Sequence, residues 1–352
     1  MSEQEKKEKK VLQKDLDMDR RELLKGLATL PAIAAFFVSL WAKLRRDAVK
    51  KSNLLQDLVK KKQAPAIVSS TGSYEHLRIG VIGYGGRGGH LVRGAGFATP
   101  GWTDMASKNA KKNKLDKSFP TFIQQQDLNV SLVGVCDLFD FRAGLGIEAS
   151  KNEVRPGGKP KETATIYRHY TELLANDNID AVIVATPDHW HSRITIDAAK
   201  AGKNVYCEKG LTRTFDEAIK VYDVVKKTGI TFQLGHQNRQ VEANEKAKQI
   251  IEQGLLGKIN LVELATNRNS PWGAWVWGIH PDGNAQTIDW DTFQEPAPNK
   301  IPFGEEALKR FFRWRCWFDY GTGLSGDLLS HDFDAINQIM DLGIPKYASS
   351  SG

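Results

Sequence analysis

Residues 77–88 read LRIGVIGYGGRG, and the rest of the chain is best understood from this segment. The apolar, β-branched start predicts a short strand, and Gly83, Gly85 and Gly88 follow it in GxGxxG spacing. Such a strand–glycine–helix unit binds dinucleotides: Gly83 permits the tight turn, Gly85 lets phosphates approach, and Gly88 lets helix and strand pack closely. The amide groups that begin the helix then hold the phosphates. A glycine-rich surface turn is the alternative interpretation.

Asp137 ends the next strand-like run, residues 130–137 (VSLVGVCD). A carboxylate at this position is expected to hydrogen-bond the ribose hydroxyls of a bound dinucleotide. It follows Gly88 at a long distance because a polar insertion, residues 101–129, separates the two; we interpret this insertion as a surface loop. A carboxylate repels the 2′-phosphate of NADP, so Asp137 favours NAD as the cofactor. The nearby Arg142 could instead pair with a 2′-phosphate, so NADP remains the alternative.

Further strand-like runs alternate with amphipathic helical stretches. Strands are expected at residues 163–169, 179–187, 204–209 and 230–235, and helices near 190–201 and 214–228. This alternation predicts an α/β fold with a doubly wound parallel sheet. Ligands bind beyond the carboxyl ends of such strands, so the loops at 186–191, 208–210 and 236–239 are expected to face one crevice.

The 352 residues carry a net charge of +7, but the positive charge is concentrated in the first 75 residues. That segment holds 16 basic and 10 acidic residues, so the remainder is nearly neutral. This distribution argues against nucleic acid as a partner. Three scattered cysteines exclude a disulfide framework and predict no metal site. We expect all three to be buried structural thiols.

Residues 1–42 resemble a twin-arginine export signal, because Arg20-Arg21 precedes the uncharged run 26–42. Residues 43–75 are predicted to be a polar linker. The resemblance implies export to the periplasm, with membrane contact only through this leader. A retained membrane anchor and a cytoplasmic tail are the alternatives, because the run lacks a clear cleavage site and is followed by a second basic cluster.

Three polar residues suggest chemistry. Lys209 follows a predicted buried strand, where a lysine is either a solvated charge or a catalytic group. Asp327 and His331 are four residues apart and would share one face of a helix. A histidine titrates near neutrality and suits a base that takes a hydroxyl proton. Ordinary polar positions on a surface helix remain the alternative for this pair.

Four motifs in order resemble the glucose–fructose oxidoreductase, inositol dehydrogenase and rhizopine catabolism (Gfo/Idh/MocA) family. They are GYGGRG at 83–88, ATPDHWH at 185–191, AGKNVYCEK at 201–209 and GTGLSGDLLSH at 321–331. The resemblance covers roughly residues 76–345. It implies an NAD(P)-binding Rossmann domain at 76–256 and a second α/β domain at 257–352 with an open, mainly antiparallel sheet.

The second sheet is expected to start with an alternating strand at 257–265. Family members extend well beyond the Asp-x-x-x-His helix. We therefore expect this sequence to hold only part of the second domain, with a shortened natural variant as the alternative. We expect the full-length protein to be a homo-oligomer.

The resemblance also implies the site residues. The family's Glu-Lys-Pro motif appears here as Glu208-Lys209-Gly210, whose lysine would lie beside the nicotinamide. The implied catalytic residues are Lys209, Asp327 and His331. The implied cofactor contacts are Gly83, Gly85, Gly88, Asp137, Thr186, Pro187, His191 and Glu208. His236 and Arg239 are candidates for substrate contact. Six tryptophans from 272 to 317 suit either sugar stacking or core packing. We expect Arg310, Arg313 and Arg315 on a solvated helix face, with contact to an acidic substrate or a neighbouring subunit as the alternative.

The expected function is an NAD(P)-dependent oxidoreductase acting on a secondary hydroxyl of a sugar, sugar derivative or cyclitol. One alternative is a redox-neutral, NAD-dependent glycosidase, and another is a non-catalytic nucleotide-binding protein. Retention of Lys209 favours net redox chemistry, because the hydrolytic relatives lack a lysine of this kind.

Overall fold

The computed structural model describes residues 38–46, 76–153, 163–268 and 271–349. The chain divides into two compact units, one of residues 69–341 and one that combines residues 1–68 with 342–352. In the latter, residues 38–46 form a helix. The twin arginines and most of the predicted linker lie outside the described residues. Within the described segments, no helix has the length and apolar character needed to cross a bilayer.

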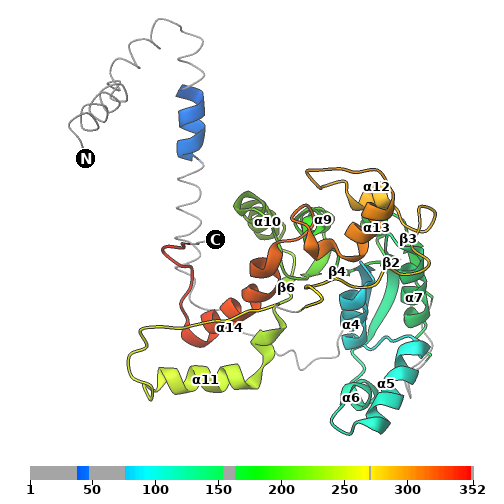
Figure 1. Cartoon of the computed structure of the whole chain (residues 1–352), viewed down its shortest axis with the longest axis horizontal. Coiled ribbons are helices and arrows are strands. Elements are labelled where there is room, and N and C mark those ends of the chain that lie inside the picture. Colours follow the sequence, from blue (N-terminus) through cyan, green and yellow to red (C-terminus); the bar gives the residue numbers. More distant parts are fainter. Residues whose placement is uncertain (1–37, 47–75, 154–162, 269–270, 350–352) are drawn as a thin grey trace, which may run out of the picture. The chain divides into compact units, whose positions relative to one another are not determined.

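A six-stranded parallel sheet forms the centre of the unit 69–341 (Figure 1). Its strands are β1 (Leu77–Ile82), β2 (Val130–Cys136), β3 (Thr165–Tyr167), β4 (Ala181–Val184), β5 (Asn204–Cys207) and β6 (Phe232–Leu234). They lie in the order β3-β2-β1-β4-β5-β6, in which the chain starts at the centre and winds outward in both directions. The predicted doubly wound parallel sheet is confirmed.

Helices cover both faces of this sheet, and each face has its own apolar core. The first face is covered by α4 (Gly86–Gly94) and α7 (Asp140–Ser150), and the second by α8 (Tyr170–Leu174) and α9 (Asp188–Lys200), with α10 (Phe215–Thr228) packed beside α9. Val81 and Val92 meet in the first core, and Val182 and Ile194 in the second. Each such fully buried side chain stabilises the fold by about 1.5–3 kcal/mol.

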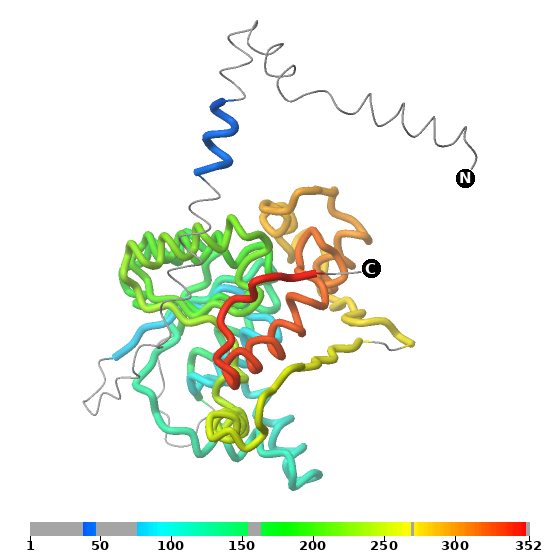
Figure 2. Tube along the Cα trace, turned by 90° about the vertical axis from the view of Figure 1, so that its left-hand side faces the viewer, coloured from blue at the N-terminus to red at the C-terminus, as the bar shows by residue number. Residues whose placement is uncertain are grey.

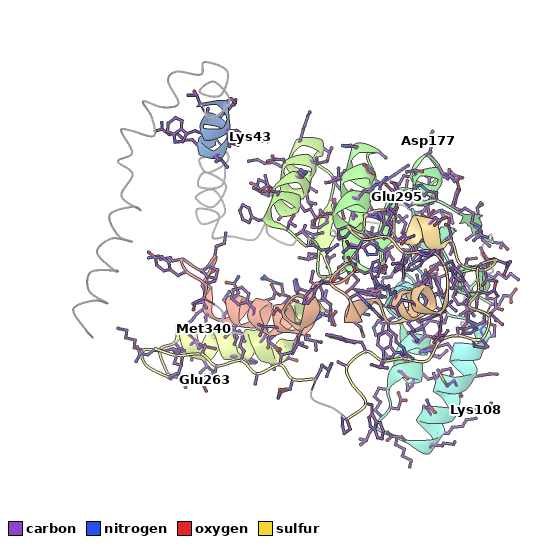
Figure 3. The ribbon with its side chains drawn as sticks, turned by 45° about the horizontal axis from the view of Figure 1, so that its top comes forward. Lys43, Lys108, Asp177, Glu263, Glu295 and Met340 are labelled. Carbon is purple, nitrogen blue, oxygen red and sulfur yellow. The ribbon has the colours of Figure 1, made fainter. Side chains whose placement is uncertain are left out.

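The insertion at 101–129 is not a loop, so the sequence interpretation is wrong there. It forms two helices, α5 (Pro100–Lys112) and α6 (Ser118–Gln124). Thr99 caps α5 by accepting a hydrogen bond from the Trp102 amide, and the Trp102 ring packs edge-on against Phe122 at 5.3 Å. Polar side chains such as Lys108 face solvent (Figure 3), which is why the composition resembled a loop.

The chain after the sheet begins with η1 (Gln237–Gln240) and α11 (Glu242–Glu252). Helix α11 lies beside α14 (Ser330–Met340), where Gln338 donates to Glu245 at 2.8 Å (Figure 2). The strand expected at 257–265 is not present: no strand is assigned there, and the segment is largely exposed around Glu263 (Figure 3). An alternating sequence becomes a strand only when a partner supplies hydrogen bonds, and this segment has no partner strand in the described chain.

A compact lobe at residues 279–320 packs against the end of β2. Its elements are α12 (Trp290–Phe293), α13 (Glu305–Phe312) and η2 (Trp314–Cys316), and the π-helical turn η3 (Ser325–Leu329) follows. The lobe contains the third apolar core of the chain, which also includes Phe139 from just after β2. The two backbones are also hydrogen-bonded, because the Asp289 amide donates to the Leu138 carbonyl at 2.9 Å. The lobe therefore lies over the carboxyl edge of the sheet, where ligands of this fold bind.

Candidate active site

The glycine turn after β1 has the geometry that each glycine was predicted to serve. Gly83 has a φ of +89°, and a Cβ there would lie 2.8 Å from the Ala185 backbone. A Cβ on Gly88 would lie 2.0 Å from the Gly83 carbonyl oxygen. A Cβ on Gly85 would meet only the Arg142 guanidinium, at 3.8 Å, so this backbone is open toward the sheet edge.

Helix α4 begins directly after this turn. In the described chain no side chain caps its first amides, and its first turn contains no acidic residue. Uncapped amides at a helix start need an acceptor and carry partial positive charge, so they suit a pyrophosphate. The residues present therefore fit a dinucleotide cofactor.

Asp137 stands at the end of β2, as predicted, and is 7% exposed. Its carboxylate accepts hydrogen bonds from the amides of Tyr84, at 2.7 Å, and Phe139, at 2.9 Å. Burial raises the pKa of Asp137, against the opposing effects of Arg142 and these amides. The side chain thus holds the glycine turn in place, and its remaining lone pairs are available to ribose hydroxyls.

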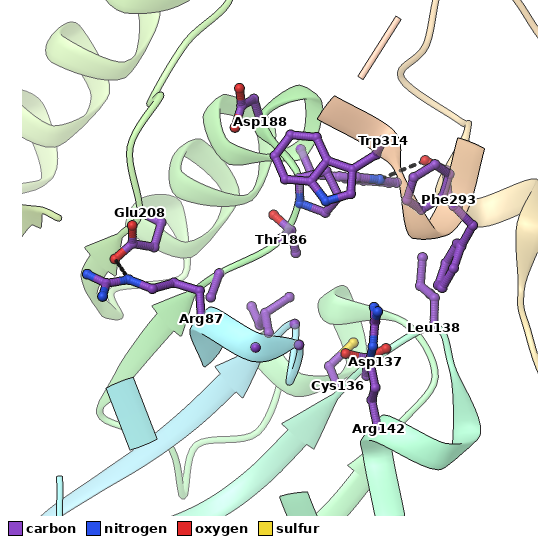
Figure 4. A pocket seen from close by; sticks show the side chains of 18 of the residues that line it. Arg87, Cys136, Asp137, Leu138, Arg142, Thr186, Asp188, Glu208, Phe293 and Trp314 are labelled. Carbon is purple, nitrogen blue, oxygen red and sulfur yellow. Dashed lines mark hydrogen bonds and ion pairs between the residues drawn. The ribbon is translucent and has the colours of Figure 1, made fainter. Parts of the chain in front are cut away.

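A cavity of about 440 Å³ runs along the carboxyl edge of the sheet (Figure 4). The strand-end loops form one wall, and the 279–320 lobe with neighbouring residues forms the other. The lining includes Gly83, Gly85, Arg87, Asp137, Leu138, Arg142, Thr186, Pro187, Asp188, Trp190, Glu208 and Lys209 on the sheet side, and Trp277, Phe293, Phe311, Phe312, Trp314 and Arg315 on the other. An apolar cleft with a few convergent polar groups is typical of a cofactor site.

The loop after β4 contributes in two ways. Thr186 lines the cavity, and its buried hydroxyl has no hydrogen-bond partner among the described residues. Pro187 precedes α9 and also lines the cavity. His191 is not in the lining: it is 1% exposed, and its ring nitrogens lie 2.7 Å from the Thr186 carbonyl and 2.8 Å from the Gly210 carbonyl. His191 therefore joins two cavity loops from behind.

Glu208 is buried, with its carboxylate paired to Arg87. The Arg87 Nε lies 2.7 Å from Glu208 Oε1, and the Tyr206 hydroxyl donates to the same oxygen at 3.1 Å (Figure 4). Arg87 also donates to Gln237 at 3.1 Å. Because Arg87 belongs to the first turn of α4, this cluster links the phosphate-binding end of the cavity to the loop that carries Lys209.

Lys209, at the end of β5, meets Asp327 from η3. The Lys209 ammonium donates to the Asp327 carbonyl at 2.6 Å and forms an ion pair with the carboxylate Oδ1. Arg315 Nε lies 3.1 Å from the same Oδ1. Burial works to raise the pKa of Asp327, but the Arg315 and Lys209 cations outweigh it, so the net shift is downward. The carboxylate is thus held ionised between two cations.

His331 lies in the first turn of α14, four residues after Asp327 of η3. Its ring packs edge-on against His236, with ring centroids 5.4 Å apart. Neither histidine is part of the cavity lining. Burial lowers the pKa of His331, and the nearby Lys209 charge lowers it further. The buried Nδ1 atom of each ring lacks a hydrogen-bond partner within the described parts of the chain. Arg239, a predicted substrate contact, instead forms a bidentate pair with Asp334 at 2.7–3.0 Å.

Sequence comparison finds a family match within the parallel-sheet domain. Residues 141–236 match the profile of the Gfo/Idh/MocA oxidoreductase family, which is described by its NAD-binding Rossmann fold. The matched segment runs from α7 to just beyond β6 of the parallel sheet. No group of three or more His, Cys, Asp or Glu side chains in its described residues is arranged to hold a metal ion.

The proteins that this chain resembles include sugar and inositol dehydrogenases. Levoglucosan dehydrogenase of Pseudarthrobacter phenanthrenivorans is 39% identical over 193 residues, which are 52% of this chain and 41% of that protein. D-xylose 1-dehydrogenase (NADP(+)) of Hypocrea jecorina is 35% identical over 112 residues, 31% of this chain and 29% of that protein. The solved structure of myo-inositol 2-dehydrogenase from Lactobacillus plantarum matches with 28% identity, a TM-score of 0.37 and coverage of 53% of this chain and 43% of that chain. The chain spans less than half the length of each of these relatives.

Two arginines were missed or misplaced from sequence. Arg315 was expected on a solvated helix face, but it lines the cavity and contacts Asp327. Arg87 carried no prediction, although its place inside the glycine motif put it beside the loop of β5. Of the three cysteines expected to be buried, Cys136 and Cys207 are, and Cys316 is exposed. Its exposure follows from its position in the short η2 turn.

The tryptophans differ in their surroundings: some are buried in a core and some line the cavity. Trp290 is 3% exposed in the core of the 279–320 lobe. Trp277 and Trp314 line the cavity, where the Arg315 guanidinium lies over both rings. Trp272 is 84% exposed and lies outside both groups.

Acid should destabilise the parallel-sheet domain through His189 in α9. The His189 Nε2 donates to the Phe293 carbonyl at 2.7 Å, and burial lowers the pKa of His189 to about 3. The folded state keeps this ring neutral, whereas the unfolded chain takes up a proton below about pH 6.5, so stability is lost as the pH falls from there toward 3. Between pH 7.5 and 5.5 we expect a loss of about 1.4 kcal/mol from this group.

Urea unfolding at both pH values checks this expectation. The His189→Gln variant keeps a donor for Phe293 and does not titrate, so it should lack this part of the pH dependence. Equal pH dependence in both proteins would contradict the role of His189.

Proposed function

We propose that this protein is an NAD(P)-dependent oxidoreductase that transfers hydride between the nicotinamide and a secondary hydroxyl of a sugar, sugar derivative or cyclitol. The observation that carries the proposal is the position of Lys209, which lines the same cavity as the glycine turn and is fixed by Asp327. The relatives named as levoglucosan, D-xylose and myo-inositol dehydrogenases support the substrate class.

Lys209 holds the substrate oxygen. An ammonium group has three N–H donors, and two of those of Lys209 have acceptors on Asp327, which leaves the third for a hydroxyl or alkoxide oxygen. A donor placed where negative charge develops lowers the barrier for oxidation of the alcohol. The nicotinamide supplies hydride acceptance at the neighbouring carbon when the cofactor is bound.

His331 takes the hydroxyl proton. Its lowered pKa keeps the imidazole neutral near pH 7, and because the ring lies outside the cavity lining, the proton reaches it through a relay rather than by direct contact with the substrate. The alcohol therefore loses a proton from oxygen and a hydride from carbon, which leaves a ketone or lactone. His236 packs against this ring and fixes its orientation.

NAD is the proposed cofactor. The Asp137 carboxylate is placed to hydrogen-bond the ribose hydroxyls of NAD. It would repel the 2′-phosphate that NADP carries on the same ribose. The Arg142 guanidinium near Gly85 leaves NADP as a second acceptable cofactor. We also propose export by the twin-arginine route and homo-oligomer formation, on the sequence evidence of the leader and the family resemblance.

A panel of sugars and cyclitols, assayed by nicotinamide absorbance with NAD and with NADP, tests the proposal. We expect NADH to bind with a fluorescence change and at least one secondary alcohol to be oxidised. If the protein binds neither NADH nor NADPH, the proposal is overturned. Release of an aglycone from a glycoside without net NADH formation would establish the glycosidase instead, and cofactor binding without any turnover would favour the non-catalytic alternative.

A further inference from the structure

One carboxylate oxygen at the reacting end of the cavity is shared by two cations. Asp327 Oδ1 accepts from Lys209 and, at 3.1 Å, from Arg315 Nε. Lys209 comes from the loop after β5, and Arg315 comes from η2 in the second half of the chain. The arrangement thus connects the Rossmann sheet to the segment that closes the cavity.

The Arg315 guanidinium is itself held in place by aromatic rings. It lies 4.1 Å from the Trp314 ring centroid and 5.7 Å from that of Trp277. Both rings line the cavity with Arg315, whose side chain is 23% exposed. A planar guanidinium that is already stacked on a ring loses little conformational freedom when it forms a directed hydrogen bond. A flexible lysine ammonium loses more.

The charges that face Asp327 come from several elements. Lys209 and Arg315 are the cations, Asp188 in α9 is the nearby acid, and His331 in α14 is the nearby imidazole. Asp188 accepts from the amide and hydroxyl of Thr322, at 3.0 and 2.7 Å, and burial raises its pKa. With Arg315 removed, Lys209 alone would have to compensate the buried Asp327 carboxylate.

We propose that Arg315 is a positioning residue for the reaction, which fixes the Asp327 carboxylate so that Lys209 keeps one N–H for the substrate oxygen. The inference rests on the proposed oxidoreductase function. Without Arg315 the Lys209 ammonium is drawn fully onto Asp327, and the carboxylate is protonated at higher pH because burial is then less opposed. Both effects reduce the fraction of enzyme in the productive arrangement.

The pH profile of kcat tests this role with three variants. Arg315→Met should lower kcat by about 10²-fold, as expected for a misplaced catalytic group, and shift the acid limb up by about one pH unit. Arg315→Lys should restore the acid limb and only part of kcat, because it keeps the charge without the planar fork. Arg313→Met is the matched control, since Arg313 donates to the Trp277 carbonyl and does not contact Asp327. NADH affinity should stay within about 3-fold in all variants.

A second measurement does not depend on turnover. We expect Arg315→Met to lower the urea midpoint more when it is introduced into the wild-type protein than when it is introduced into the Asp327→Asn variant. In Asp327→Asn the charge partner of Arg315 is already absent. Equal shifts in the two backgrounds, or an unmoved acid limb in an active Arg315→Met enzyme, would overturn the inference. If the wild-type protein oxidises no alcohol, the proposed function fails, and the urea comparison still decides whether Arg315 and Asp327 are coupled.

Discussion

Replacement of Lys209 by methionine is expected to lower kcat by about 10²–10³-fold while leaving NADH affinity nearly unchanged. A single donor directed at a developing oxyanion contributes this much to catalysis. The side chain is 10% exposed and pairs with Asp327, whereas the phosphates are proposed to bind at the separate glycine turn. Stopped-flow hydride transfer and NADH fluorescence titration measure the two quantities separately.

The comparison needs a control for the buried charge that the substitution leaves behind. In Lys209→Met, Asp327 keeps only Arg315 as a cation, so part of the loss comes from a disturbed carboxylate. The double variant Lys209→Met with Asp327→Asn removes that charge. Turnover near the wild-type rate in Lys209→Met, or full recovery in the double variant, would exclude Lys209 as the donor to substrate.

Replacement of Gly88 by alanine is expected to weaken NADH binding by at least about 100-fold. The new Cβ would lie 2.0 Å from the Gly83 carbonyl oxygen, and a backbone atom cannot move aside as a flexible side chain can. The glycine turn must therefore open, and overpacking of this kind costs about 1–3 kcal/mol or more of stability. NADH titration and thermal unfolding check both consequences.

Gly94 in the same helix provides the matched control. A Cβ there meets nothing within 4 Å, and alanine favours a helix over glycine by about 0.5–1 kcal/mol. Gly94→Ala should therefore bind NADH normally and unfold at the same or a slightly higher temperature. Equal NADH affinity in Gly88→Ala and Gly94→Ala would show that the turn does not hold the cofactor.

The Rossmann sheet was predictable because its strands are buried on both faces. A buried parallel strand must be continuously apolar, and Val182 and Val184 in β4 lie in such a run. Helix α5 was not predictable in the same way, because it buries only Thr103 and Ala106 and leaves most of its length polar. The strand expected at 257–265 failed for a related reason, since pairing depends on residues far away in the sequence.

The candidate site was predictable where a motif ties residues to a turn. Gly83, Gly85 and Gly88 are constrained by local backbone geometry, which spacing alone conveys. Arg315 gave no such signal, because its contact with Asp327 depends on the fold of the whole 279–320 lobe. The role of His191 behind the cavity was hidden for the same reason, as a carbonyl 19 residues away is one of its partners.

The backbone hydrogen bond between Leu138 and Asp289 would link the folding of sheet and lobe to binding of the proposed cofactor. Six of the lining residues belong to the lobe that packs on this anchor, so the complete wall exists only when sheet and lobe are both folded. A ligand that binds only this state stabilises it by RT ln(1 + [L]/Kd), about 2.7 kcal/mol at 100 times Kd. A dinucleotide that contacts both walls would therefore stabilise the sheet and the lobe together.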